Sequence, residues 1–375
     1  MNFVNAFTQL FSNFGNLTWQ MVVMWGIGAL LIYLAIVKKM EPSLLLPMGF
    51  GAILVNLPLS GAITQGDTVG PISALFEAGM SNELFPLLLF IGIGAMIDFG
   101  PLLEKPWLML FGAAAQFGIF FTLFVAGFFF DLKDAASIAV IGAADGPTAI
   151  FVANTLRSQY LGAIMVAAYS YMALVPIVQP PVIRLLTTKK ERRIRMSYRK
   201  GNVSQLTKIL FPIVVTVIAG IVAPASVALV GFLMFGNLIR ECGVLNSLSD
   251  TAQNVLANLI TIFLGITIAS QMQADKFLAP QTLMILGLGL VAFIFDTAGG
   301  VLFAKFMNLF LKKKINPMIG ACGISAFPMS SRVVAKMALA EDKGNFLLMQ
   351  AAGVNVGGQV ASVIAGGLIL NLIAR

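Results

Sequence analysis

The chain has 375 residues, of which 58% are hydrophobic and 11% are charged, and its mean hydropathy is +0.92. Because a soluble domain carries about 25% charged residues, this composition excludes a soluble fold and predicts an all-α, polytopic membrane protein. The chain has no histidine and only two cysteines, far apart at 242 and 322, which excludes His-ligated metal sites, His proton relays and a disulfide framework. We attribute the net charge of +8 to cytoplasmic loops and not to nucleic-acid binding.

We expect about ten spanning helices and two broken or re-entrant segments. The predicted spans are, in chain order, 18–37, 43–58, 84–100, 107–130, 159–185, 209–222, 226–240, 254–270, 281–311 and 345–373. Some of these are shorter than the ~20 residues that a simple crossing needs. Two further apolar stretches, 135–157 and 316–340, are interrupted by Gly, Pro, Ser and Asp, and we predict that neither simply crosses the membrane.

The distribution of basic residues favours this interpretation. With both interrupted stretches broken, the basic loop 186–208 and the 312–314 run face the cytoplasm, and of the 24 Lys and Arg residues only Lys133, Arg157, Lys276 and Arg375 fall outside. If 135–157 crossed as an ordinary span, the basic loop would move to the outer face, against the positive-inside rule. The basic residues of this loop include Lys189, Lys190, Arg192, Arg193, Arg195, Arg199 and Lys200.

The same topology predicts an inverted repeat. Residues 1–185 form the first half, 186–208 the cytoplasmic loop and 209–375 the second half, and each half has four spans, a broken segment and one more span. The broken segments share a short string, Ile141-Gly142-Ala143-Ala144 and Ile319-Gly320-Ala321-Cys322. Inverted repeats with paired discontinuous helices are typical of ion-coupled transporters, whose site lies near the midplane. The alternative is chance similarity between Gly-rich spans.

The first broken segment contains an acid in the sequence Asp145-Gly146-Pro147-Thr148. A carboxylate at membrane depth costs roughly 3 kcal/mol on insertion scales, and the Gly and Pro that follow interrupt helical hydrogen bonding. The break therefore places free carbonyls beside the Asp145 carboxylate and the Thr148 hydroxyl, a set that suits Na⁺. Asp-Gly-Pro is also common in surface turns, but the apolar flanks argue against that alternative.

The second broken segment, from Asn316 to Ser325, offers an amide oxygen, a hydroxyl and glycines such as Gly320 for close backbone approach. It contains no carboxylate, so an ion site shared by both segments would carry one negative charge, from Asp145. One charge favours Na⁺ or H⁺ over a divalent ion. Asn316-Pro317 also fits a helix N-terminus, with Asn as the cap and Pro in the first turn, and the two roles are compatible.

The last span places Asn355, Gln359 and Ser362 near one helical face. Asn355 could give its amide oxygen to the ion. Alternatively, this face is a packing seam of small residues joined by polar side chains.

Tyr169 and Tyr171 follow the first broken segment. Without histidine, Asp145 and a tyrosine are the candidates for moving a proton inside the membrane, although either tyrosine could simply be a packing aromatic. Arg332 could hold a ligand carboxylate bidentately or could be a cytoplasmic topology charge. Three further acids near the membrane lack the Gly-Pro context of Asp145, namely Asp98, Glu241 and Asp296.

The stretches 145–151 and 316–325 and the Asn355 region resemble the beta subunit of sodium-pumping, biotin-dependent decarboxylases, and the resemblance extends over nearly the whole chain. It implies an enzyme subunit that decarboxylates carboxybiotin and drives Na⁺ outward while a proton is consumed. The carboxybiotin would be supplied by a separate biotin carrier subunit, loaded by a carboxyltransferase alpha subunit. The sequence Val334-Ala335-Lys336-Met337 only faintly resembles a biotin attachment site, so we expect no covalent biotin on this chain.

The resemblance also implies residue roles, partners and location. It links Asp145, Asn316, Ser325 and Asn355 to the ion, Tyr171 to proton transfer, Gly320 to close backbone approach and Arg332 to the coupling region. Together with the inferences from the residues themselves, the predicted Na⁺ ligands are Asp145, Thr148, Asn316, Gly320, Ser325 and Asn355, and the predicted catalytic residues are Asp145, Tyr171 and Arg332. The implied partners also include a small single-span membrane subunit and further copies of the chain, in the cytoplasmic membrane of a prokaryote.

A second hypothesis is a stand-alone, Na⁺-coupled secondary transporter of an organic anion. The same inverted repeat and oxygen cluster would serve it, and Arg332 could hold the anion. The sequence does not reveal whether the parent decarboxylase would act on oxaloacetate, glutaconyl-CoA or methylmalonyl-CoA.

Overall fold

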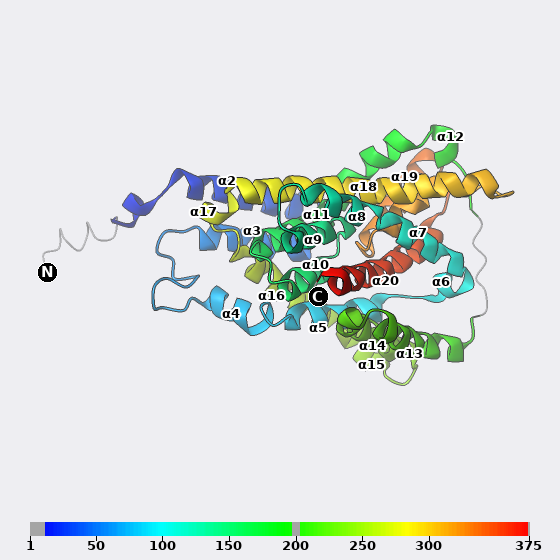
Figure 1. Cartoon of the computed structure of the whole chain (residues 1–375), viewed down its shortest axis with the longest axis horizontal. Helices are drawn as coiled ribbons and strands as arrows, with labels where there is room; N and C mark the ends of the chain where they lie inside the picture. The colour runs from blue at the N-terminus through cyan, green and yellow to red at the C-terminus, as the bar shows by residue number, and fades with distance from the viewer. Residues whose placement is uncertain (1–11, 197–202, 374–375) are drawn as a thin grey trace, which may run out of the picture. The chain divides into compact units, whose positions relative to one another are not determined.

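A computed structural model of the chain describes residues 12–196 and 203–373 (Figure 1). Within these ranges the chain is α-helical with short 3₁₀ and π turns and no β-strand, apart from an isolated bridge between Gln65 and Thr68. Seven helices in the described ranges are long and apolar enough to cross a membrane, or eight if a pair bent by 65° counts as one span. These observations confirm an all-α, multi-pass membrane protein.

Each predicted span contains a helix, but not every helix is long enough to cross by itself. The main helices are α2 (Trp19–Ile36), α3 (Pro42–Val55), α4 (Pro71–Gly79), α5 (Leu84–Met96), α6 (Gly100–Glu104), α7 (Met109–Ala115), α8 (Phe117–Ala126), α9 (Leu132–Ala139), α10 (Gly146–Thr155), α11 (Leu161–Leu186), α12 (Lys189–Arg192), α13 (Gln205–Val222), α14 (Val227–Glu241), α15 (Asn246–Asp250), α16 (Ala257–Ala269), α17 (Ala274–Phe277), α18 (Pro280–Phe310), α19 (Met329–Glu341) and α20 (Leu348–Ile373). Helices α3, α5 and α14 have 14, 13 and 15 residues, short of the ~20 that span a bilayer. The number of about ten spans therefore stays a prediction.

The chain forms two compact units. One comprises Met1–Phe85 with Asn258–Met284, and the other comprises Pro86–Ala257 with Ile285–Arg375. Every residue of the predicted site belongs to the second unit. This division does not test the predicted inverted repeat. The repeat, with residues 1–185 and 209–375 as its halves, therefore stays a prediction.

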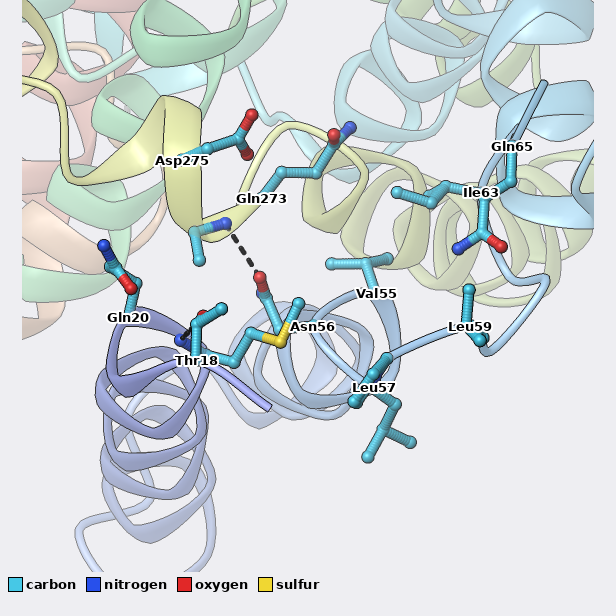
Figure 2. A pocket seen from close by; sticks show the side chains of 13 residues that line it. Thr18, Gln20, Val55, Asn56, Leu57, Leu59, Ile63, Gln65, Gln273 and Asp275 are labelled. Carbon is cyan, nitrogen blue, oxygen red and sulfur yellow. Dashed lines mark hydrogen bonds between the residues drawn. The ribbon is translucent and has the colours of Figure 1, made fainter. Parts of the chain in front are cut away.

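In the first unit, α2 and α3 pack closely through glycines. A Cβ at either Gly28 or Gly49 would lie 2.7 Å from the carbonyl oxygen of the other, so small residues bring the two backbones together. This unit contains a pocket of about 300 Å³. In it the Asn56 side-chain oxygen accepts a hydrogen bond from the Ala274 backbone N–H at 2.8 Å, drawn as a dashed line in Figure 2. None of the predicted site residues lines this pocket.

In the second unit, the first interrupted stretch breaks where Gly and Pro predict it. Helix α9 is followed by a 3₁₀ turn, η3 (Val140–Ala143), and this turn is capped by Ala144, which has a left-handed φ of 51°. Asp145 is extended, and α10 begins at Gly146 with Pro147 in its first turn, a position where the missing N–H of proline costs nothing.

The second interrupted stretch begins with a seven-residue 3₁₀ segment, η6 (Pro317–Gly323). A non-helical stretch, 324–328, separates η6 from α19. Helix α20 is buried over most of its length and packs against η6, α19, α10 and α7 (Figure 1). Both breaks are therefore covered by the same long helix.

The basic segment after α11 is fastened to the end of α19. Arg192 pairs with Glu341 at 2.7 Å, and Arg195 donates two hydrogen bonds to the Asp342 carboxylate at 2.7 and 2.9 Å. Arg199 and Lys200 of the predicted basic loop, and the C-terminal Arg375, lie outside the described residues.

Candidate ion site at the two helix breaks

Asp145 lies at the start of α10, with 3% of its surface exposed. Three neutral groups donate hydrogen bonds to its Oδ2 atom: the Thr148 hydroxyl at 2.6 Å, the Ser362 hydroxyl at 2.9 Å and the Gln359 amide at 3.2 Å. Among the described residues, no Lys or Arg pairs with this carboxylate. The acid thus joins α10 to α20 and has no fixed counter-ion among the described residues.

The two breaks are in direct contact. Ser325, just after η6, donates from its backbone N–H and from its hydroxyl to the Ala143 carbonyl oxygen, at 3.0 and 3.1 Å. The Ser325 hydroxyl also lies beside the Asp145 carboxylate. The interruption of each predicted half therefore contributes to one polar cluster.

Asn355 holds α20 against the second break. Its amide nitrogen donates to the carbonyl oxygens of Cys322 and Ile324, at 3.2 and 2.8 Å. Its amide oxygen is buried and has no hydrogen-bond partner among the described residues. Nearby, a Cβ at Gly358 would overlap the Gly323 carbonyl oxygen, so the close approach of α20 depends on glycine.

The cluster contains one carboxylate, three hydroxyls and one unpartnered amide oxygen. Hard cations prefer such oxygen ligands. No group of three or more His, Cys, Asp or Glu residues that could hold a metal is found in the described ranges. A single negative charge matches a monovalent cation better than a divalent one.

Asn316 and Gly320, two of the predicted ligands, have other contacts. The Asn316 amide nitrogen donates to the carbonyl oxygens of Arg192 and Ile194, and its oxygen accepts from the Met318 N–H. Seven residues of 3₁₀ helix rise about 14 Å, so Asn316 stands at the far end of η6 from Ser325. At Gly320, a Cβ would overlap the Gly300 carbonyl oxygen of α18, which makes it a packing position.

Among the described residues, no hydrogen bond or ion pair joins Tyr171, Tyr169 or Arg332 to the Asp145 carboxylate. The Tyr171 hydroxyl donates to the Leu286 carbonyl on α18. Tyr169 is closer to the break, because a Cβ at Gly146 would lie 2.5 Å from its ring, and its buried hydroxyl has no partner among the described residues. Arg332 is exposed on α19.

The sequence indicated Gln359 and Ser362 only as part of a polar face with Asn355. Their hydrogen bonds to the Asp145 carboxylate could not be predicted. Helical spacing shows that the two side chains share a face of α20, but it does not show which element packs against that face. The contact was found only in the folded chain.

A family model described as "Na+-transporting oxaloacetate decarboxylase beta subunit" matches residues 20–373. The chain belongs to this family. Among its relatives, the methylmalonyl-CoA decarboxylase subunit beta of Propionigenium modestum is 47% identical over 373 residues and covers 94% of both chains. The glutaconyl-CoA decarboxylase subunit beta of Acidaminococcus fermentans is 47% identical over 374 residues, covering 99% of this chain and 98% of the relative.

A third relative, the oxaloacetate decarboxylase beta chain of Klebsiella pneumoniae, is 44% identical over 410 residues and covers 94% of both chains. Three substrates are thus named among relatives of similar identity. Membership of this decarboxylase beta-subunit family is consequently clear, while similarity does not single out one carboxylic acid.

Proposed function

We propose that this chain decarboxylates carboxybiotin on a separate carrier subunit and couples the release of CO₂, with uptake of one proton, to Na⁺ export. The observation that carries the proposal is the pair of hydrogen bonds from Ser325 to the Ala143 carbonyl oxygen beside Asp145. It makes one oxygen cluster out of two helix breaks, as expected for a midplane ion site. Membership of the decarboxylase beta-subunit family supports the class of reaction.

The chemistry needs a proton and an apolar environment. Decarboxylation breaks the bond between the ureido nitrogen of biotin and the carboxyl carbon. The electron pair stays on nitrogen, which takes up a proton, and neutral CO₂ leaves. An apolar site favours this step because the carboxylate loses its charge. Carboxybiotin is therefore a substrate delivered to this chain and not a resident cofactor.

In this proposal Na⁺ is held by the Asp145 carboxylate together with oxygens of Thr148, Ser325, Asn355 and Ser362. A hydroxyl that donates its hydrogen to the carboxylate keeps lone pairs that can face a cation. The unpartnered amide oxygen of Asn355 supports this set, because a buried polar oxygen without a partner is costly. Asn316 and Gly320 are left to the structural roles described above.

Helix α20 supplies the coupling between the breaks. Gln359 and Ser362 bind the Asp145 carboxylate, while Asn355, one turn earlier, binds carbonyls of the second break. A movement of either break would change the ligands available to the ion. Na⁺ and H⁺ compete for the same carboxylate, so binding of one lowers the affinity for the other by the same factor.

The proposed setting is the cytoplasmic membrane of a prokaryote, with the basic loop on the cytoplasmic side and about ten spans in an inverted repeat. The partners are the biotin carrier, the carboxyltransferase alpha subunit, a small single-span subunit and further copies of the chain. Tyr171 would take part in proton transfer and the exposed Arg332 in coupling or in holding the incoming carboxylate.

The test is reconstitution of the chain with its partner subunits in vesicles, with Asp145→Asn compared with Asp134→Asn. Asp134 is a matched control, because it is also buried, on α9, and accepts hydrogen bonds from Ser158 and Gln159. Asp145→Asn should weaken Na⁺ activation by more than about a hundredfold, whereas Asp134→Asn should leave it unchanged. Na⁺-independent decarboxylation by both variants would refute the proposal, and Na⁺-driven uptake of an organic anion by the chain alone would favour the transporter hypothesis.

A further inference from the structure

Helix α18 carries a second acid, Asp296, whose surface is 0% exposed. Its Oδ1 atom accepts a hydrogen bond from the Ile119 backbone N–H, in the first turn of α8, at 3.1 Å. Its Oδ2 atom is buried and has no hydrogen-bond partner among the described residues. Nothing in the proposed ion site uses this group.

The Asp296 carboxyl group lies against the first helix break. A Cβ at Gly142, in η3, would lie 2.6 Å from Oδ2 and 2.7 Å from the Ala292 Cβ. Gly142 precedes Asp145 by three positions and is followed by Ala143, which accepts the hydrogen bonds from Ser325. The two acids therefore flank the same short turn.

An ionised carboxylate in the membrane interior needs a positively charged partner or hydrogen-bond donors to both oxygens, and Asp296 has neither in the described part of the chain. No Lys or Arg pairs with it in the described part of the chain. The start of α8 offers a partial positive charge, but this reaches only Oδ1. An unpaired charge at such a depth is costly. A protonated group fits better, with Oδ1 accepting from Ile119 and Oδ2 carrying the proton.

The two described elements that contact Asp296 from outside α18, namely α8 and η3, offer no group that could share the charge. Neither α8 nor η3 carries a titratable side chain. The acid nearest to η3 along the chain is Asp145. The tyrosines near the break are Tyr169, whose ring lies against Gly146, and Tyr171, which packs with Ile141 against Gly289. A proton on Asp296 thus lies against η3, whose last residue, Ala143, accepts the hydrogen bonds from Ser325.

We propose that Asp296 is a second proton-binding acid of this chain, which holds a proton against the first helix break and releases it during the decarboxylation cycle. Its place in the cycle rests on the function proposed above. The O–H bond of Asp296 breaks and the ureido nitrogen of biotin gains the N–H bond as its bond to the carboxyl carbon breaks. The carboxylate left behind adds negative charge beside η3, which favours Na⁺ at Asp145, and Asp296 then regains a proton from water.

The resting protonation state can be tested on the purified full chain alone. Infrared spectra at neutral pH should contain a protonated-carboxyl band that is present in the wild type and in Asp145→Asn but absent in Asp296→Asn. A band that disappears in Asp145→Asn and persists in Asp296→Asn would overturn the proposal, as would the lack of any such band. Asn at 296 keeps an oxygen to accept from Ile119, so the α8 contact is retained.

The role in the cycle is tested in the reconstituted complex. Asp296→Asn should lower Na⁺-dependent decarboxylation by about a hundredfold, the size of a typical general-acid contribution, while calorimetric Na⁺ affinity stays within about twofold of the wild type. Full activity would show that Asp296 only caps α8, and a large loss of Na⁺ affinity would show a cation ligand; both results overturn the proposal. If the wild-type complex shows no Na⁺ dependence, the proposed function fails while the infrared result still decides the protonation of Asp296.

Discussion

Ser325 gives both of its donors to one acceptor, the carbonyl oxygen of Ala143, with distances of 3.0 Å from the backbone N–H and 3.1 Å from the hydroxyl. The acceptor becomes available because Ala144 is left-handed and Asp145 is extended, so the helical ladder stops at Ala143. Two helix interruptions whose contacting residues lie 182 positions apart in the chain thus satisfy each other's backbone hydrogen-bonding groups.

Replacing Ser325 by Ala should weaken Na⁺ binding while leaving the fold intact. The backbone bond to Ala143 remains, but a hydroxyl beside Asp145 is lost, and one such group contributes about 1 kcal/mol, or roughly five- to tenfold in affinity. Calorimetric titration with Na⁺ checks this. The control is Ser331→Ala, which removes a buried hydroxyl that only donates to the Pro328 carbonyl. Equal affinities for the two variants would contradict the assignment of Ser325.

Asn316→Ser should loosen the basic segment without changing the ion site. Serine can still cap η6, but the bonds to the carbonyls of Arg192 and Ile194 are lost, at a cost of about 1–3 kcal/mol for buried groups left unpaired. Hydrogen exchange of residues 192–196 should accelerate, while Na⁺ affinity stays within about twofold. A large fall in Na⁺ affinity in the folded variant would instead make Asn316 a ligand, as the family resemblance implies.

Gly358→Ala should destabilise the chain by about 1–3 kcal/mol and abolish tight Na⁺ binding. The added methyl would overlap the Gly323 carbonyl oxygen, which is backbone and cannot rotate away, so α20 must shift from the second break. Gly287→Ala is the matched control, since a Cβ there meets nothing within 4 Å and alanine favours a helix. Thermal unfolding in detergent measures the stability of both variants, and a Gly358→Ala chain with normal Na⁺ affinity would disprove this reasoning.

The attachment of the basic segment to α19 should depend on acid pH. The hydrogen bonds from Arg195 lower the pKa of the Asp342 carboxyl group from 3.8 to about 2. Because the folded-state pKa lies below the unfolded value, the contribution of Asp342 to stability is complete above about pH 5 and is lost as the pH falls towards 2. Carbon NMR of the carboxyl group should show this low midpoint, and Arg195→Gln should move it towards 3.8. An unchanged midpoint in Arg195→Gln would exclude the ion pair as the cause.

The sequence predicted the helical fold and the position of the first break because these depend on local properties. Hydropathy identifies apolar helices, and Gly146-Pro147 directly after Asp145 favours the start of a helix over its continuation, because an interior proline removes a helical hydrogen bond. The number of crossings was harder to predict, since α3 and α14 are apolar but short, and apolar character alone does not distinguish a spanning helix from a buried one.

Partners across the fold were less predictable. Asn316 looked like an ion ligand and a helix cap, and only the packing of residues 192–194 onto η6 shows what its amide contacts. Asp296 lacked a sequence signal because its environment comes from α8 and η3, which lie far from it in the chain. Long-range contacts of this kind are fixed by tertiary packing and not by helical periodicity.

The most direct measurement is a structure of the reconstituted complex with Na⁺ at a resolution that shows the coordinating oxygens. We predict an ion that contacts the Asp145 carboxylate of the first break and at least one oxygen from Ser325 or Asn355 at the second. An ion bound away from Asp145, or coordinated by residues of one break alone, would contradict the shared site.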